Sequence, residues 1–215
     1  MADIFKEVEE DLRREKYEQL WQRYGRWVIA LAVLAVLGTA GSVAWQRYQQ
    51  HREAQLAEQY GAAIALTDPS TGDLAKADAA LANIADAGGG YGALASLERA
   101  AVKAKAGDID GAAKIYDAMV ADSTTPAALR DLAKLLKVMR LVDSGDPAAL
   151  TSDLAPLMAP ENPWRFTATE LTAILALKSG DQKHATELFT QLADDQAAPS
   201  GLRARAAEMA AALKG

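Results

Sequence analysis

The sequence predicts an all-α protein in which one N-terminal transmembrane helix is followed by a stack of helical hairpins, an α-solenoid. Three observations lead to this prediction. A stretch of 19 residues near the N-terminus, 27–45, carries no charge. A Gly-Asp pair recurs four times in the rest of the chain, at intervals of 35, 38 and 35 residues. Half of the residues are hydrophobic although only 6% are aromatic, and such an alanine-rich chain favours packed helices over sheet.

The uncharged stretch begins at Trp27 and ends at Trp45. At ~1.5 Å per residue, a helix over this stretch is about 28 Å long, close to the ~30 Å hydrocarbon thickness of a bilayer. A helix satisfies its own backbone groups, which lipid cannot do, and tryptophan is enriched at both membrane interfaces. We therefore predict a transmembrane helix over 27–45, with Trp27 and Trp45 at its two ends.

Basic residues around this helix predict its orientation. Arg13, Arg14, Lys16, Arg23 and Arg26 precede it, whereas Arg47 and Arg52 are the basic residues that follow it closely. Because positive charge accumulates on the cytoplasmic side, residues 1–26 would be cytoplasmic and 46–215 would face the periplasm, or its equivalent, across the cell inner membrane. The alternative is a signal peptide cleaved near Ser42-Val43-Ala44. The seven acidic residues before the apolar stretch favour the uncleaved anchor.

The cytoplasmic segment 1–26 has an amphipathic pattern with helical spacing, formed by Phe5, Val8, Leu12, Leu20 and Tyr24. It is either a docking helix, a helix on the inner leaflet, or a polar tail that only sets topology. Within the anchor, Ala35, Gly38 and Ser42 share one face. Small side chains let another membrane helix approach closely, so these three predict a helix contact, although small residues are also common in any membrane helix.

The soluble part is predicted to be built from repeated helical hairpins. After Trp45 no turn signal occurs before Thr67-Asp68-Pro69, so the membrane helix continues outward. In each Gly-Asp pair, glycine can end one helix in the left-handed conformation and aspartate can cap the next. The pairs are Gly72-Asp73, Gly107-Asp108, Gly145-Asp146 and Gly180-Asp181. Glycine or proline residues mark the starts of the other helices, at Gly88–Gly90, Pro126, Pro163 and Pro199.

Hydrophobic residues stay in register after each glycine and define the buried face of each second helix. Five positions after the four glycines come Ala77, Ala112, Leu150 and Ala185. Nine positions after them come Leu81, Tyr116, Leu154 and Phe189, and twelve positions after them come Ile84, Met119, Leu157 and Leu192. Steps of four and three keep them on one helical face. A hairpin of 34–38 residues with this pattern is typical of tetratricopeptide repeats. We predict about four hairpins and a C-terminal capping helix in a domain over 46–215.

Composition and motifs argue against catalysis and nucleic-acid binding. The formal charge is −6 and cysteine is absent, which excludes thiolate chemistry and disulfides and disfavours contacts with phosphates. No nucleophile elbow, P-loop or metal-spaced cluster occurs. We therefore expect no enzyme, no metal, no cofactor and no catalytic residue.

One basic pattern predicts a binding surface. Arg130, Lys134 and Lys137 recur at helical spacing on the first helix of one hairpin, and Arg99 and Lys103 are similarly placed one hairpin earlier. First helices of such hairpins tend to line the concave groove. The five residues therefore suggest a basic strip suited to acidic or C-terminal peptide groups; the alternative is an ordinary solvated helix face.

The string YGALASLE, with Tyr91, Gly92, Leu94, Leu97 and Glu98, resembles the ancillary SecYEG translocon subunit family, the YfgM-like proteins. The likeness continues through Gly107–Ala113 and extends to the overall plan of the chain. It implies a non-catalytic inner-membrane protein whose periplasmic repeats associate with the Sec translocon and a membrane-anchored peptidyl-prolyl isomerase, and pass client polypeptides to chaperones. The alternative is a scaffold of another envelope assembly, such as a division, respiratory or wall-building complex.

Overall fold

The computed structural model describes the backbone of residues 2–214 and the side chains of 21–27, 29–31 and 33–214, and every regular element in this part is helical. Most of the amphipathic pattern predicted for 1–26 lies outside the described side chains. The elements are α1 (Ala2–Ala65), α2 (Leu74–Asp86), α3 (Gly89–Lys105), α4 (Ile109–Ala121), α5 (Ala127–Leu141), α6 (Pro147–Leu154), the 3-10 helix η1 (Ala155–Met158), α7 (Arg165–Lys178), α8 (Gln182–Asp194) and α9 (Ser200–Lys214).

The chain divides into two compact units, 1–55 and 56–215. The first consists of α1 alone, up to Gln55. The last ten residues of α1 belong to the second unit, where they form the first helix of the first hairpin. As expected from the lack of a turn signal after Trp45, α1 continues without a break to Ala65.

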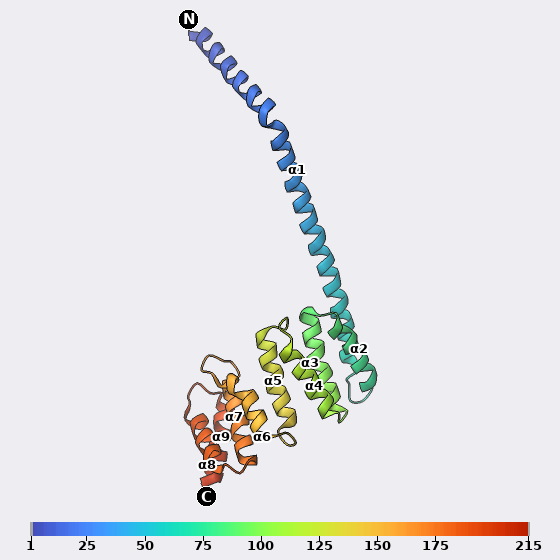
Figure 1. Ribbon diagram of the computed structural model, residues 1–215, viewed down its shortest axis with the longest axis vertical. Coiled ribbons are helices and arrows are strands. Elements are labelled where there is room, and N and C mark those ends of the chain that lie inside the picture. The colour runs from blue at the N-terminus through green and yellow to red at the C-terminus, as the bar shows by residue number, and fades with distance from the viewer. Residues whose placement is uncertain (1, 215) are drawn as a thin grey trace. The chain divides into compact units, whose positions relative to one another are not determined.

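In the second unit each helix packs against the next one along the chain, as Figure 1 shows for α2 to α9. The hairpins pair α3 with α4, α5 with α6 and α7 with α8, and α9 packs on α8. The end of α1 pairs with α2 in the same way, because Ala63 shares a hydrophobic cluster with Ala77 and Leu81. In addition, α3 contacts α5 and α5 contacts α7. The first helices of successive hairpins are therefore neighbours and form one layer.

The four aspartates predicted as helix caps all fulfil that role. The side chain of Asp73 accepts hydrogen bonds from the amides of Ala75 and Lys76 at 3.1 Å. Asp108 accepts from Gly111, Asp146 from Ala148 and Ala149, and Asp181 from His184. These bonds satisfy amides that a helix start leaves without a partner, so each aspartate fixes where the second helix of its hairpin begins.

The predicted core positions are also confirmed. All twelve residues in the three registers are at most 5% exposed. They belong to four hydrophobic clusters that follow one another along the chain, each shared by neighbouring helices. Because one hairpin cannot cover its own apolar face, stacking on the next hairpin completes each cluster.

The prediction for the four glycines is confirmed at two positions and wrong at the other two. Gly107 and Gly180 have φ of 84° and 85°, where a side chain would be strained. Gly72 and Gly145 do not have positive φ. They are glycine because of close packing: a Cβ on Gly72 would overlap the carbonyl oxygen of Leu66, and one on Gly145 would lie 3.0 Å from Leu150.

The second helix of the third hairpin is short, which the repeat pattern did not predict. Pro156 lacks an amide hydrogen, and its ring would clash with the carbonyl four residues earlier in a continuous α-helix. Helix α6 accordingly ends at Leu154 and continues as the 3-10 turn η1. Leu157 is nevertheless fully buried, so the register of the hairpin is kept. Pro126 and Pro199 directly precede α5 and α9, whereas α7 begins two residues after Pro163.

Candidate interaction surface

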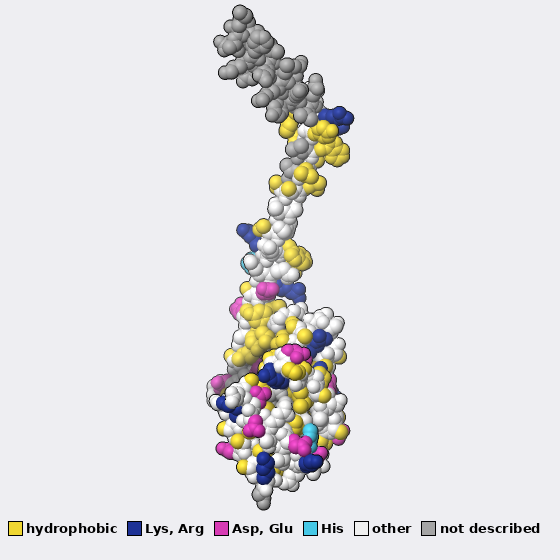
Figure 2. All heavy atoms as spheres, turned by 90° about the vertical axis from the view of Figure 1, so that its left-hand side faces the viewer, with side chains coloured by type: hydrophobic (Ala, Val, Ile, Leu, Met, Phe, Trp, Pro, Cys, Tyr) yellow, Lys and Arg dark blue, Asp and Glu magenta, His cyan; other side chains and the backbone are white. Residues whose placement is uncertain are grey.

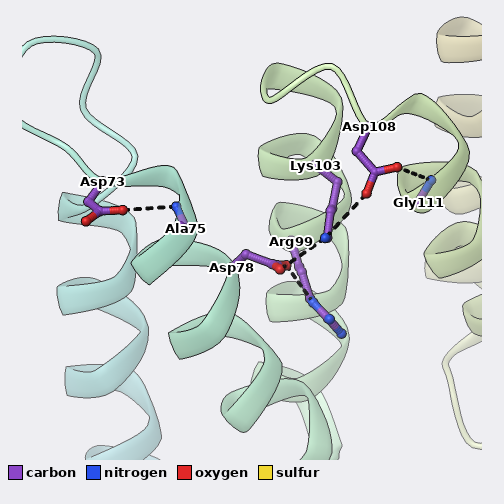
Figure 3. Close-up of polar contacts among 7 residues, drawn as sticks. All are labelled: Asp73, Ala75, Asp78, Arg99, Lys103, Asp108 and Gly111. Atoms are coloured by element: carbon purple, nitrogen blue, oxygen red, sulfur yellow. Dashed lines mark hydrogen bonds and ion pairs between the residues drawn. The ribbon is translucent and has the colours of Figure 1, made fainter.

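The basic residues predicted to line a groove are largely engaged in ion pairs within the repeat unit. Figure 3 shows the first group, in which α3 is joined to α2 and to the start of α4. The Nε of Arg99 donates to Asp78 at 2.8 Å. The Nζ of Lys103 lies 3.3 Å from Asp78 and 3.4 Å from Asp108. Arg99 and Lys103 therefore connect neighbouring helices.

These contacts perturb the ionisation of two of the residues. The hydrogen bond to Asp78, followed by that to Asp108, raises the pKa of Lys103. The backbone hydrogen bond from Gly111, with a further contribution from Lys103, lowers the pKa of Asp108. The cap of α4 and the α3 ion pair thus share one carboxylate.

Lys137 makes the equivalent connection one hairpin later. Its Nζ donates to Asp117 on α4 at 2.7 Å and to Asp153 on α6 at 2.9 Å. Burial opposes its charge, because the side chain is only 17% exposed, but the two hydrogen bonds outweigh burial and raise its pKa. A ligand that recruited Lys137 would have to displace two carboxylates.

Arg130 and Lys134 lie on α5, two turns and one turn before Lys137, respectively, and both are partly exposed. Arg130 acts on the carboxylate of Asp122 in the preceding loop. The five basic residues are thus divided between separate interactions. On the face of the repeat unit visible in Figure 2, Lys and Arg side chains alternate with Asp and Glu. The basic strip stays a prediction, in which only Arg130 and Lys134 would be available without breaking a described ion pair.

The five residues of the YGALASLE motif all lie in α3 but serve different purposes. A Cβ on Gly92 would lie 3.0 Å from the carbonyl oxygen of Ala85, so this glycine allows α3 to pack closely on α2. Tyr91 contacts the ring of Tyr60, with centroids 6.0 Å apart. Leu97 packs against the cluster shared by α3, α4 and α5. Leu94 is 41% exposed, which is unusual for a leucine in this unit.

The predicted anchor residues lie on an exposed part of α1. Trp27 and Trp45 are 68% and 63% exposed, and Ala35, Gly38 and Ser42 are exposed as well. A Cβ on Gly38 would meet no atom within 4 Å. The Oγ of Ser42 donates to the backbone carbonyl of Thr39 at 2.8 Å, so its hydroxyl is satisfied within the helix. This leaves the small-residue face open to another helix.

Within the described residues, α1 from Trp21 to Ala65 is the one helix that is long and apolar enough to cross a membrane. The described leucine, isoleucine and valine side chains between Ile29 and Val43 are about half to three-quarters exposed, and Figure 2 shows hydrophobic side chains on the surface of this helix. Among the same residues, no group of three His, Asp or Glu side chains is arranged to hold a metal ion.

Comparison with known proteins identifies the repeat family. No curated protein and no solved structure matches the chain. The family model of the tetratricopeptide repeat-like domain matches residues 18–152. This range contains the apolar stretch of α1, the first two hairpins and most of the third, up to residue 152 in α6. Since the match covers more than half of the chain, the protein belongs to the tetratricopeptide repeat-like domain family.

Proposed function

We propose that this protein is a non-catalytic adaptor of the cell inner membrane, anchored by residues 27–45 and carrying its repeat domain, 46–215, in the periplasm. Domains of this family serve protein–protein interaction, and their surfaces are built from stacked hairpins rather than from a catalytic cleft. In this proposal the repeats engage a chaperone, an isomerase or emerging secreted polypeptides beside the Sec translocon.

The observation that supports this proposal most strongly is the extent of the family match. It begins at residue 18, before the apolar stretch, and runs through it into the hairpins. This extent supports the proposal that the exposed apolar helix and the repeats work together, with the helix as an anchor. The resemblance of YGALASLE to the translocon subunit family supplies the more specific partners.

The small-residue face of the anchor is the proposed contact with the translocon. Gly38 would allow close approach of a neighbouring backbone, with Ala35 and Ser42 one turn on either side. Val36 points to the opposite side of the helix, because two residues correspond to a rotation of about 200°. Val36 therefore provides a matched control position on the same helix.

Site-specific crosslinking in intact cells tests the proposal. A photoreactive residue at Gly38 should crosslink to translocon helices identified by mass spectrometry, and one at Val36 should crosslink mainly to lipid. Crosslinks from Gly38 to a division, respiratory or wall-building complex would instead favour the alternative scaffold. Equal crosslinking from both positions would refute a specific helix contact.

A further inference from the structure

One face of α3 remains partly uncovered after α2 and α4 have packed on the helix. Tyr91, Leu94, Glu98 and Ala101 follow one another at steps of three, four and three residues, so they share this face. Leu94 is 41% exposed and the other three are partly exposed. Tyr60, near the end of α1, borders the face on one side through its ring contact with Tyr91.

Helix α5 packs beside α3 through Leu129 and Leu136, which share a cluster with Leu97 of α3. Met139 follows Leu136 by one turn on the same side of α5. The two helices are in direct contact, and Met139 is 48% exposed. The next residue, Arg140, acts on the phenol of Tyr116 and opposes the rise of its pKa. We refer to Tyr60, Tyr91, Leu94, Glu98 and Met139 together as the Glu98 face.

The charge of Glu98 acts on two phenols from different helices. Burial raises the pKa of both Tyr60 on α1 and Tyr116 on α4, and the charge of Glu98 adds to this rise. At Tyr116 the cation of Arg140 acts more strongly than Glu98 and in the opposite direction. The charge of Glu98 thus acts on side chains of α1 and α4. In the part of the chain whose side chains are described, no Lys or Arg forms an ion pair with this carboxylate.

The nearby cations are engaged elsewhere. Arg99 and Lys103 are turned to Asp78 and Asp108, and Arg140 acts on the phenol of Tyr116. Residues 56–215 contain 21 Asp and Glu against 15 Lys and Arg, a net charge of −6. The overall charge of the unit, together with a Glu98 carboxylate that no described Lys or Arg pairs with, therefore favours a cationic ligand over an acidic one.

We infer that the Glu98 face binds a Lys or Arg side chain of a partner polypeptide, flanked by apolar residues. The cation pairs with Glu98 and lies against the rings of Tyr60 and Tyr91, since a carboxylate beside aromatic faces attracts a cation by both charge and ring quadrupole. Leu94 and Met139 contact the apolar neighbours of the cation. This inference rests on the proposed adaptor function and specifies the chemistry of its partner.

The test uses the full-length chain in nanodiscs of zwitterionic phosphatidylcholine and fluorescence anisotropy with short labelled peptides. One peptide carries lysines among leucines and alanines, and in two others the lysines are replaced by glutamate or glutamine; empty nanodiscs correct for lipid binding. The lysine peptide should bind most tightly, and higher salt should weaken its binding. Equal binding of the glutamate peptide, or no binding of the lysine peptide, would overturn the inference.

Variants then locate the site. Glu98→Gln should weaken binding of the lysine peptide about fivefold to tenfold, the loss expected for a partly desolvated ion pair, and Glu98→Lys should shift preference to the glutamate peptide. Glu208→Gln on α9, also exposed, is the matched control and should leave binding unchanged. Unaltered binding in Glu98→Gln, with an unfolding temperature equal to that of the parent, would exclude this face.

The crosslinking and peptide-binding experiments distinguish a failure of the adaptor function from a failure of the Glu98 face. If Gly38 crosslinks to the translocon but Glu98→Gln has no effect on peptide binding, the adaptor function stands and the Glu98 face is wrong. If Glu98→Gln weakens binding but Gly38 gives no specific crosslink, the face stands and the translocon assignment is wrong.

Discussion

At the scale of single residues, Asp108 shows how one side chain can hold two elements together. It accepts the Gly111 amide at 2.8 Å and so starts α4, and it lies 3.4 Å from Lys103 of α3. The hydrogen bond from Gly111, and then Lys103, lower its pKa in the folded protein. A carboxylate with a depressed pKa stabilises the fold above its unfolded pKa, about 3.9, and this contribution is lost as the pH falls through the folded value.

The substitution Asp108→Asn separates the two contributions, because asparagine also caps helices but carries no charge. We expect the unfolding temperature of Asp108→Asn to lie a few degrees below that of the parent at pH 7. The difference should shrink as the pH falls below about 4, where the unfolded chain takes up a proton at this aspartate, and should be lost as the pH falls through the lower pKa of Asp108 in the folded protein. Thermal unfolding followed by circular dichroism between pH 3 and 7 measures this.

Asp110→Asn is the control, since Asp110 lies in the first turn of the same helix without providing the side-chain cap. Its effect should be smaller at every pH. A deficit of Asp108→Asn that does not change with pH would show that the charge of Asp108 contributes nothing.

The residue scale also shows what the sequence could and could not predict. The four cap aspartates were predictable because a cap acts on amides two or three residues away. The ion pairs of Arg99 and Lys137 could not be predicted in this way, because their partners Asp78 and Asp117 lie 21 and 20 residues away on other helices. Helical spacing says which residues share a face, but not which carboxylate the neighbouring helix presents there.

At the scale of helices, the third hairpin differs most from the repeat pattern. Pro156 ends α6 after eight residues, and the remaining contacts are made by η1, which packs on α7. The signal was present in the sequence, because a proline at this position disfavours a continuous helix, whereas the register of Leu150, Leu154 and Leu157 suggested one. Lys137 joins this shortened hairpin to α4 through its two carboxylates.

Replacing Lys137 tests the importance of that connection. Lys137→Ala should lower the free energy of unfolding by about 1 kcal/mol, because two partly exposed aspartates lose their common cation. Lys134→Ala, one turn earlier on α5, should change it by less than about 0.5 kcal/mol. Urea unfolding of the two variants provides the comparison. Equal effects would indicate that Lys137 contributes only as part of an ordinary solvated face.

At the scale of the whole chain, the apolar residues of the repeats are buried, whereas those of the anchor segment of α1 are exposed. In residues 56–215 the hydrophobic side chains that define the repeats are buried in four clusters. In α1 between Trp27 and Trp45 the described leucines and valines remain exposed. Exposed apolar surface of this length requires a partner or lipid, and its length fits a bilayer.

A charge in the middle of this stretch should therefore impair insertion while leaving the repeats folded. Leu34 is 68% exposed, and Leu34→Arg adds about 2.5–3.5 kcal/mol to the cost of insertion at the centre of a membrane helix. After carbonate extraction, a larger fraction of the variant should be soluble. Gln50→Arg, also exposed on α1 but outside 27–45, is the control and should remain membrane-bound like the parent.

Protease accessibility tests the central proposal, an anchored chain with its repeats outside the cytoplasm, most directly. Protease is added to cells whose outer envelope has been opened while the inner membrane stays intact, with a cytoplasmic protein as the integrity marker. The account predicts that residues 56–215 are degraded and that a short membrane-protected fragment containing 1–45 survives. Survival of the repeat unit, under conditions that degrade another protein exposed on the same side, would contradict it.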